Sequence, residues 1–173
     1  NGLERIRFAS PHPRHVTGRM IAAMRDLPKV CRHLHLPVQS GSTRVLGLMR
    51  RRHTREEYLE LVASLRAAMP DIALSTDMIV GFPGETEDDF DRTMRLVADL
   101  AFDASFSFIY SRRAGTPAAD LEDDTPQTVK LARLQRLQAL LNGNVARYSS
   151  AMIGTTQRIL VEGPSRKDSA ELM

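Results

Sequence analysis

The sequence IALSTDMIVGFPGET, residues 72–86, combines a largely apolar run with an abrupt turn. The run predicts a strand over 72–82 that is covered on both faces, as in a parallel sheet. Two glycines and a proline then form a turn, and Thr86 precedes the acidic first turn of an amphipathic helix. A buried strand that leads through a turn into a helix is the repeating unit of α/β proteins.

This strand–turn–helix pattern occurs four times along the chain. Strands are expected over 5–9, 33–38, 72–82 and 104–110. The alternation predicts a parallel sheet with right-handed crossovers, and four units amount to half of an eight-stranded barrel. A last strand over 156–163 has the character of a different, β-type module. We therefore expect an α/β domain over 1–153 and the start of a second domain over 154–173.

Capping residues and apolar stripes place the helices. Thr17 should cap a helix that Pro28 ends, and Thr54 and Thr86 should cap two more. The first of these helices is expected to bury Met20, Ile21, Met24 and Leu27. The long helix after Pro126 is expected to bury one stripe, formed by Leu131, Leu134, Leu137, Leu141, Val145, Tyr148 and Met152.

Composition narrows the class of protein. Hydrophobic residues make up 42% of the 173 residues, but no apolar run approaches the roughly 20 residues that a membrane helix needs. The start resembles no signal peptide and lacks a methionine, so we expect a segment of a longer, cytoplasmic protein. The net charge of +3 is gathered in basic clusters at 50–53, 112–113 and 166–167. Such clusters are either solvated charge or contacts to a phosphate-bearing partner.

The cysteine and histidine residues alone give little indication of a metal site or a reactive thiol. Cys31 is the single cysteine, which excludes an intrachain disulfide and cannot alone hold an iron–sulfur cluster or zinc. A buried structural thiol is preferred to a reactive one. His33 and His35 share one face of a strand, where packing and hydrogen bonding are preferred to metal binding.

Candidate site residues follow the strands, where ligands bind in α/β folds. Gln39, Ser40, Gly41 and Ser42 supply an amide, two hydroxyls and a flexible backbone, although helix capping also explains Ser42. The Gly81–Thr86 turn suits either an anionic ligand or an ordinary βα turn.

Two charged residues near these strand ends are also candidates. Asp77 lies within an apolar strand, and its carboxylate needs a ligand amine or hydroxyl, or a salt bridge to a neighbouring strand. Arg113 can pair with a carboxylate or phosphate, or remain solvated.

These residues also carry a family resemblance. The segments HLPVQSGS (35–42), RRHTREEY (51–58) and STDMIVGFPGET (75–86) closely resemble the radical-SAM methylthiotransferases. The match continues through 106–110, GTPAA (115–119) and LVEGPSRK (160–167), in the same order along the chain. Within the family the chain looks like the branch that adds a 2-methylthio group to isopentenyladenosine next to the tRNA anticodon. The branch that modifies a ribosomal protein is the alternative.

The resemblance implies a fold and a chemistry. The chain would be the last four units of a radical-SAM partial (β/α) barrel plus the first strand of a TRAM β-barrel. The implied cofactors are S-adenosylmethionine and two 4Fe–4S clusters, with the cluster ligands outside this segment. The implied reaction begins with reductive cleavage of S-adenosylmethionine to a 5′-deoxyadenosyl radical. This segment alone is therefore expected to be inactive.

The resemblance also implies roles for individual residues. Those expected at the cofactor are Gln39, Ser40, Gly41, Ser42, Asp77, Ile79, Gly81 and Arg113. Those expected at RNA are Arg51, Arg52, Arg166 and Lys167. The expected partner is the anticodon stem-loop of tRNA, bound by a monomer, with the electron donor and sulfur source unspecified. The residues leave two other functions open. The chain could be an RNA-binding segment without catalytic activity, or a barrel enzyme that acts on a phosphate sugar.

Overall fold

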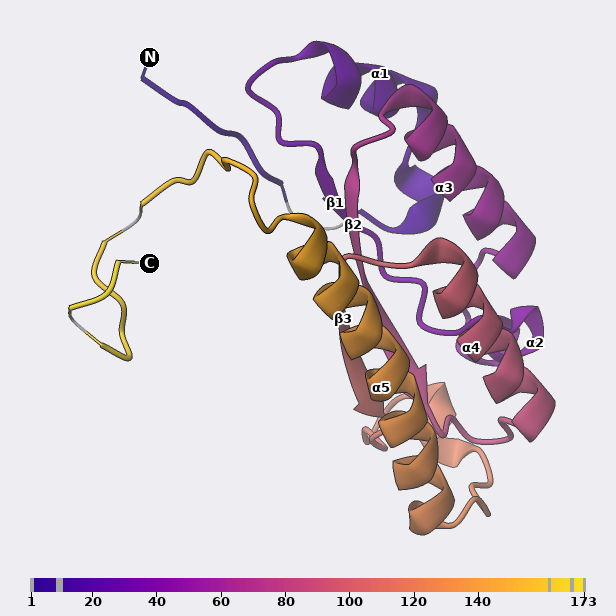
Figure 1. Cartoon of the computed structure of the whole chain (residues 1–173). Coiled ribbons are helices and arrows are strands. Elements are labelled where there is room, and N and C mark those ends of the chain that lie inside the picture. The colour runs from indigo at the N-terminus through magenta and orange to yellow at the C-terminus, as the bar shows by residue number, and fades with distance from the viewer. Residues whose placement is uncertain (1, 9–10, 162, 169, 173) are drawn as a thin grey trace.

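A computed structural model describes residues 2–8, 11–161, 163–168 and 170–172. Three parallel strands form one sheet in chain order: β1 (His33–His35), β2 (Ala73–Val80) and β3 (Ala104–Ile109). The α-helices are α1 (Gly18–Asp26), α2 (Thr43–Leu48), α3 (Arg55–Ala68), α4 (Glu87–Leu100) and α5 (Gln127–Ala151). Two 3-10 turns are added, η1 (Pro13–His15) and η2 (Pro117–Asp120). The parallel α/β architecture predicted from the sequence is confirmed (Figure 1).

The first predicted strand is reduced to one point of pairing. Ile6 and Val30 form an isolated parallel bridge beside the start of β1, and Ala9 lies outside the described residues. The second predicted strand is also shorter than 33–38. Its pairing nevertheless continues beyond β1, because Leu36 N–H donates to Ser75 O at 2.7 Å and Gln39 bridges Met78. The sheet therefore has three strands, and the strand predicted over 5–9 is wrong except for the one bridge at Ile6.

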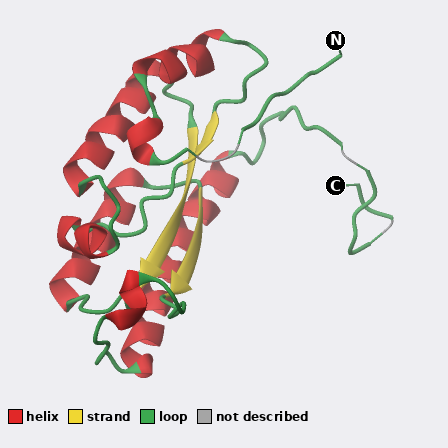
Figure 2. Cartoon of the chain, turned by 180° about the vertical axis from the view of Figure 1, so that it is seen from behind, coloured by secondary structure: helices red, strands yellow, loops and turns green. Residues whose placement is uncertain are grey.

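The helices gather on one face of the sheet and leave the other face open, as Figure 2 shows from behind. Between sheet and helices lies one core, built from Leu34, Leu74, Met78, Phe90 and Phe102, each at most 1% exposed. Tyr58 of α3 is also buried there and donates a 2.8 Å hydrogen bond to Leu36 O. One-sided covering makes the open face and the carboxyl edge of the sheet available to ligands or partners.

The predicted helix caps are confirmed. Thr17 Oγ1 accepts from Met20 N–H, and Thr54 and Thr86 both form complete capping boxes, with Glu57 and Asp89 respectively. These reciprocal hydrogen bonds satisfy amides that the helices leave unpaired. The caps therefore fix where each helix begins relative to the strand before it.

The predicted buried faces of α1 and α5 are partly wrong. Leu27 is 53% exposed because it lies beyond the last turn of α1, at its C-cap. Along α5, Leu137 and Leu141 are buried, but Leu131, Val145 and Met152 are each more than 40% exposed. The buried positions that sequence patterning missed are polar: Lys130, Arg133 and Asn144.

Arg133 is buried because it has acidic partners on the neighbouring unit. Its guanidinium donates to the Glu85 carboxylate at 2.9 Å and to Glu85 O at 3.1 Å, and it also reaches Glu87. The Glu85 side chain is 0% exposed. Burial raises the pKa of Glu85, whereas the Gly81 N–H and Arg133 favour its ionised form. The helix is thus oriented by an ion pair as well as by leucines.

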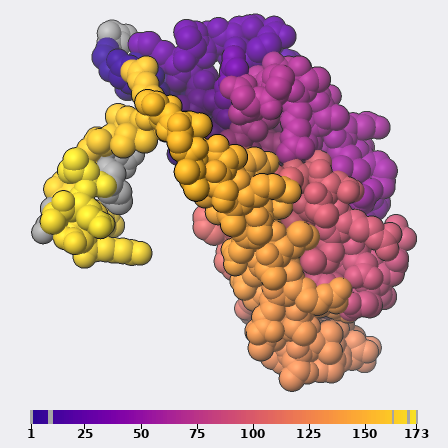
Figure 3. Space-filling view, viewed as in Figure 1, coloured from indigo at the N-terminus to yellow at the C-terminus, as the bar shows by residue number. Residues whose placement is uncertain are grey.

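The C-terminal residues leave the body of the molecule as an extended tail (Figures 1 and 3). The predicted strand over 156–163 is absent from the described residues 156–161, and Glu162 lies outside the description. A strand needs a neighbour for its backbone groups, and the only described pairing beyond α5 is the Pro164–Leu172 bridge. Assignment of 154–173 to a TRAM domain stays a prediction. No described helix is long and apolar enough to cross a membrane.

Arg133→Met should destabilise the fold by about 3–5 kcal/mol, because it leaves the Glu85 carboxylate buried without its counter-charge. Arg136→Met is the matched control. Arg136 also pairs with Glu87 and stacks over Phe90, but it is 51% exposed, so its loss should cost about 0–1 kcal/mol. Urea unfolding at neutral pH measures both, and equal losses would contradict the role given to the buried pair.

Candidate functional site

A cavity of about 610 Å³ lies at the carboxyl edge of the sheet. Segments that follow all three strands contribute to it, together with the last two residues of β3. Its lining residues are Gln39, Met49, Arg51, Asp77, Ile79, Phe82, Phe108, Ile109, Tyr110, Ser111, Arg113, Thr116 and Ala118. Both the volume and the mixture of apolar walls with a few polar groups suit a small-molecule ligand.

Gln39 enters the cavity from a strained backbone position. Its φ of 75° lies in the left-handed region, which residues other than glycine adopt at a cost. Two hydrogen bonds of 2.9 Å hold it there, since Gln39 N–H donates to Asp77 O and Ile79 N–H donates to Gln39 O. The residue is only 5% exposed. A buried amide fixed at this place can donate and accept hydrogen bonds toward a ligand.

Asp77 provides the carboxylate of the cavity. Its side chain is 30% exposed, and Oδ1 lies 3.3 Å from His35 Nε2 on β1. The other ring nitrogen of His35 bonds Ser75 Oγ at 3.0 Å, so hydrogen bonding fixes this imidazole. The contact between neighbouring strands that the sequence left open thus exists, and Asp77 still lines the cavity.

Two guanidinium groups line the same cavity as this carboxylate. Burial lowers the pKa of Arg51, and Asp77 partly opposes that shift. Arg113 lines the same cavity. One carboxylate and two guanidinium groups therefore share a single space. Such a set suits a zwitterionic ligand, whose ammonium and carboxylate need opposite partners.

Aromatic side chains form the apolar wall. Phe82 and Tyr110 pack edge to face with their ring centroids 4.9 Å apart, and Ile79 and Phe108 extend the surface. The Tyr110 hydroxyl is buried without a hydrogen-bond partner among the described residues. An unsatisfied buried hydroxyl is costly, so a polar ligand atom would stabilise it. This residue lies within the family segment 106–110, but its hydroxyl was not predicted as part of the site.

Three of the predicted loop residues face α4 and do not line the cavity. Gly41 N–H donates to Thr93 Oγ1 at 2.9 Å, and Ser40 Oγ lies 3.4 Å from the same hydroxyl. Ser42 Oγ donates to Asp89 at 2.6 Å and accepts from Val45 N–H as the cap of α2. The structure therefore shows Ser40, Gly41 and Ser42 anchoring the loop that carries Gln39.

Asp89 is the centre of this anchor. Its carboxylate accepts hydrogen bonds from Ser42, Thr86 and Arg44, although its side chain is only 5% exposed. Arg44 also donates to Gly84 O in the turn after β2 at 2.6 Å. Burial would raise the pKa of Asp89, but these hydrogen bonds outweigh it and hold the pKa far below its ordinary value.

Gly81 is required by its backbone and by the helix beside it. Its φ is 65°, and an added Cβ would lie 2.6 Å from Lys130 Cγ. Its N–H donates to the Glu85 carboxylate at 2.8 Å. Gly81 thus sets the close approach of α5 to the turn, whereas Ile79, two residues earlier, lines the cavity itself.

The four predicted RNA contacts do not lie together. Arg51 lines the cavity and Arg52 is exposed next to it in sequence. Arg166 and Lys167 are exposed in the projecting tail. The functional residues that sequence reasoning missed are Tyr110, Glu85, Asp89 and Arg44. Tyr110, Glu85 and Asp89 lie in or beside segments singled out as a strand, a turn and a helix start, whereas nothing in the sequence pointed to Arg44.

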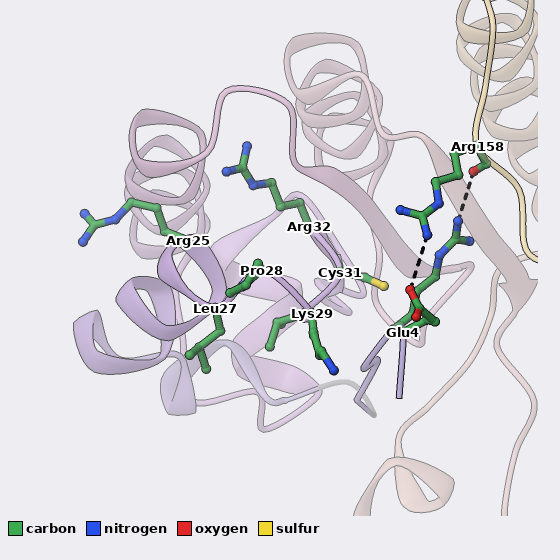
Figure 4. A pocket seen from close by; sticks show the side chains of 10 residues that line it. Glu4, Arg25, Leu27, Pro28, Lys29, Cys31, Arg32 and Arg158 are labelled. Carbon is green, nitrogen blue, oxygen red and sulfur yellow. Dashed lines mark hydrogen bonds and ion pairs between the residues drawn. The ribbon is translucent and has the colours of Figure 1, made fainter. Parts of the chain in front are cut away.

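The described residues do not fit an iron–sulfur cluster. No group of three or more His, Cys, Asp or Glu side chains is arranged to hold a metal in the described part of the chain. Cys31 is free and half-buried in a separate cavity of about 480 Å³, just before β1 (Figure 4). Glu4, Arg32 and Arg158 line the same cavity, and one thiol supplies a single ligand.

Comparison with known proteins places this geometry in a family. The model of the radical SAM superfamily matches residues 1–97. The chain belongs to the radical SAM superfamily. It is similar to tRNA-2-methylthio-N(6)-dimethylallyladenosine synthase of Bordetella petrii, at 62% identity over 99% of this chain and 36% of the relative.

The corresponding synthases of Bordetella avium and Burkholderia vietnamiensis are each 60% identical over 99% of this chain. The chain spans little more than a third of the length of these relatives. Its fold is also similar to that of the radical SAM enzyme coproporphyrinogen III oxidase (HemN) from Escherichia coli. The TM-score is 0.63 at 24% identity, covering 78% of this chain and 31% of the other.

Gly41→Ala should disturb the anchor of the Gln39 loop. The added Cβ would lie 2.5 Å from Arg92 O and Thr93 Cα, which are backbone atoms of α4. We expect a loss of about 1–3 kcal/mol. Gly47→Ala is the control, because nothing lies within 4 Å of its added Cβ in α2. That change should stabilise by about 0.5–1 kcal/mol. Urea unfolding measures both, and a neutral Gly41→Ala would contradict the close packing.

Asp89→Asn should lower stability most at neutral pH. The pKa of Asp89 is lowered on folding, so its ionised form stabilises the native state fully above its ordinary value of 3.8. The difference between wild type and variant should shrink as the pH falls below that value. Asp88→Asn, an exposed control on the same helix, should show a smaller difference throughout. Urea unfolding at several pH values tests this, and a gap that widens in acid would contradict it.

Proposed function

We propose that the chain is the carboxy-terminal part of the radical-SAM barrel of a tRNA methylthiotransferase. The parent would add a 2-methylthio group to isopentenyladenosine next to the anticodon. The single observation that carries the proposal is the cavity at the carboxyl edge of the sheet, in a chain 62% identical to such a synthase. The described contacts give that cavity its opposite charges, apolar wall and fixed amide.

We propose that the cavity binds S-adenosylmethionine. Asp77 would receive the ligand ammonium or ribose hydroxyls, and Arg51 and Arg113 would receive its carboxylate. Ile79 and the Phe82–Tyr110 pair would pack against the adenine, and the Gln39 amide would orient a polar edge. Support for this fit comes from the unpartnered Tyr110 hydroxyl. When bound, S-adenosylmethionine supplies both the radical precursor and the methyl group.

The remaining predicted residues would act through the fold. Ser40, Gly41 and Ser42 hold the Gln39 loop on α4, and Gly81 holds the turn against α5. They would therefore position the ligand contacts without touching the ligand. The Gln39 loop and the turn after β2 are held in place before any ligand binds. Binding therefore costs less conformational entropy.

Both 4Fe–4S clusters would be held by other parts of the parent, since the described residues do not fit them. We accordingly propose that this chain alone does not catalyse the reaction. The proposed partner is the tRNA anticodon stem-loop, approached by Arg51 and Arg52, with Arg166 and Lys167 reaching RNA from the tail. We further propose a monomeric, cytoplasmic protein.

Calorimetry with S-adenosylmethionine tests the cavity directly. The chain should bind it, and Asp77→Asn and Arg113→Ala should each weaken binding about tenfold, the loss of one charged contact. Asp71→Asn is the control, because Asp71 lies before β2 and pairs with Arg32, outside the cavity. Binding by neither the chain nor the longer parent would refute the assignment.

Activity of the parent separates the two branches of the family. The longer parent, assayed with an isopentenyladenosine-containing tRNA and with ribosomal protein, should methylthiolate the tRNA alone. The 173-residue chain should methylthiolate neither. Modification of ribosomal protein would favour the other branch, and modified tRNA from the chain alone would contradict its proposed inactivity.

A further inference from the structure

Two loops that are far apart in the sequence bring basic residues together. η1 carries His15, with His12 as its N-cap and Arg14 within it, and the segment before α3 carries 50–53. His12 joins the two loops, because its ring packs edge to face on His53 at 5.4 Å and tilted on His15 at 5.7 Å. The basic residues of the two loops are His12, Arg14, His15, Arg50, Arg51, Arg52 and His53, which we term the basic ridge.

The arginines of the basic ridge form no ion pairs among the described residues, although Arg51 shares its cavity with Asp77. In the part of the chain that the structure describes, none of Arg14, Arg50, Arg51 and Arg52 forms an ion pair or a side-chain hydrogen bond. Elsewhere many arginines are paired, including Arg25, Arg32, Arg44, Arg92, Arg133 and Arg136. Arg14, Arg51 and Arg52 all act on His12 and therefore lie close enough to repel one another, so a bound anion would stabilise the ridge.

Repulsion within the ridge is visible at His12. Burial lowers the pKa of His12, and Arg51, His15, Arg14 and Arg52 lower it further. These neighbours come from both loops, so positive charge from the two loops meets at His12. Two acidic residues lie beside the ridge: Asp77 shares the larger cavity with Arg51, and Glu57 shares the smaller one with Arg14 and His53. The Glu57 carboxylate already accepts the Thr54 N–H in the cap of α3.

A second observation points to a ligand at the same place. His53 is 7% exposed, and both of its ring nitrogens are buried without a hydrogen-bond partner among the described residues. It lines a cavity of about 250 Å³ together with Arg14, Pro13 and Tyr58. The Val38 carbonyl favours the protonated form of His53 against the effect of burial, but this contact lacks the geometry of a full hydrogen bond, so the ring is poorly satisfied. Phosphate oxygens are acceptors that arginine and histidine both bind.

We propose that the basic ridge is a phosphate track for the sugar–phosphate backbone of the RNA that carries the target nucleoside. Arg51 connects the two sites, since it belongs to the ridge and also lines the 610 Å³ cavity. A nucleoside turned into that cavity would have its flanking phosphates near the ridge. This inference rests on the proposed function, and it adds His12, Arg14, His15, Arg50 and His53 to the RNA-binding surface.

Fluorescence anisotropy with a labelled tRNA anticodon stem-loop transcript tests the track. The double variant Arg14→Ala/Arg52→Ala should weaken binding about tenfold and lower the salt slope of log K by about 1.4, or about 0.7 for each lost phosphate contact. Arg14→Lys/Arg52→Lys should keep most of the slope, because the charges remain. Arg92→Ala/Arg95→Ala is the matched control, because it removes two charges from exposed arginines on α4 outside the ridge, and it should change binding less than about twofold.

Equal effects of the α4 and ridge double variants would overturn the proposal, since binding would then follow net charge alone. Displacement of the transcript by an equal concentration of poly-glutamate would also overturn it, in favour of an acidic protein partner. Calorimetry with S-adenosylmethionine on the same samples reports on the cavity separately. Salt-dependent RNA binding that needs Arg14 and Arg52, without binding of S-adenosylmethionine, would support the ridge while refuting the proposed cofactor site.

Discussion

The carboxylate of Asp89 accepts hydrogen bonds from two different loops at once. Ser42 belongs to the loop after β1, and Thr86 to the turn after β2. Arg44 completes the junction by bonding both Asp89 and the carbonyl of Gly84. Because the carboxylate is buried, each of these donors offsets part of its desolvation cost, and losing one would leave charge without solvation. The separation of the two loops, and hence the shape of the cavity, depends on this junction.

A second buried charge works in the same way on the other side of the turn. Glu85 receives the Gly81 N–H and Arg133 of α5, so the turn is held between α4 and α5. The charged side chains of these two junctions form hydrogen bonds and ion pairs within the protein. The cavity is lined instead by other residues, including Gln39, Asp77, Tyr110 and Arg113. Within the same loops, some residues thus hold the fold together and their neighbours line the cavity. Such a division allows a rigid rim without using the groups that a ligand needs.

Local sequence signals predicted the elements well, because caps and buried strands depend on near neighbours. The capping boxes at Thr54 and Thr86 and the long apolar strand ending at Val80 are examples. The face of α5 was predicted less well, because counting apolar residues cannot show that Arg133 meets a carboxylate 48 positions earlier. The same holds for Ser42, whose partner Asp89 lies 47 positions away. The pattern located the rim loops and the family, whereas long-range polar pairing decided which side chains line the cavity.

The order of the strands has a consequence for how the chain acquires its structure. Neighbouring strands in the sheet are also consecutive in sequence, and each pair is joined through helical segments between them. Each new unit can therefore dock on the one made just before it, although pairing across crossovers such as His33–Ala73 still has to overcome loop-closure entropy. During synthesis on the ribosome, β1 and α3 can associate before β3 has been translated. We expect the Arg133–Glu85 pair to form last, so that arrival of α5 locks a sheet already assembled.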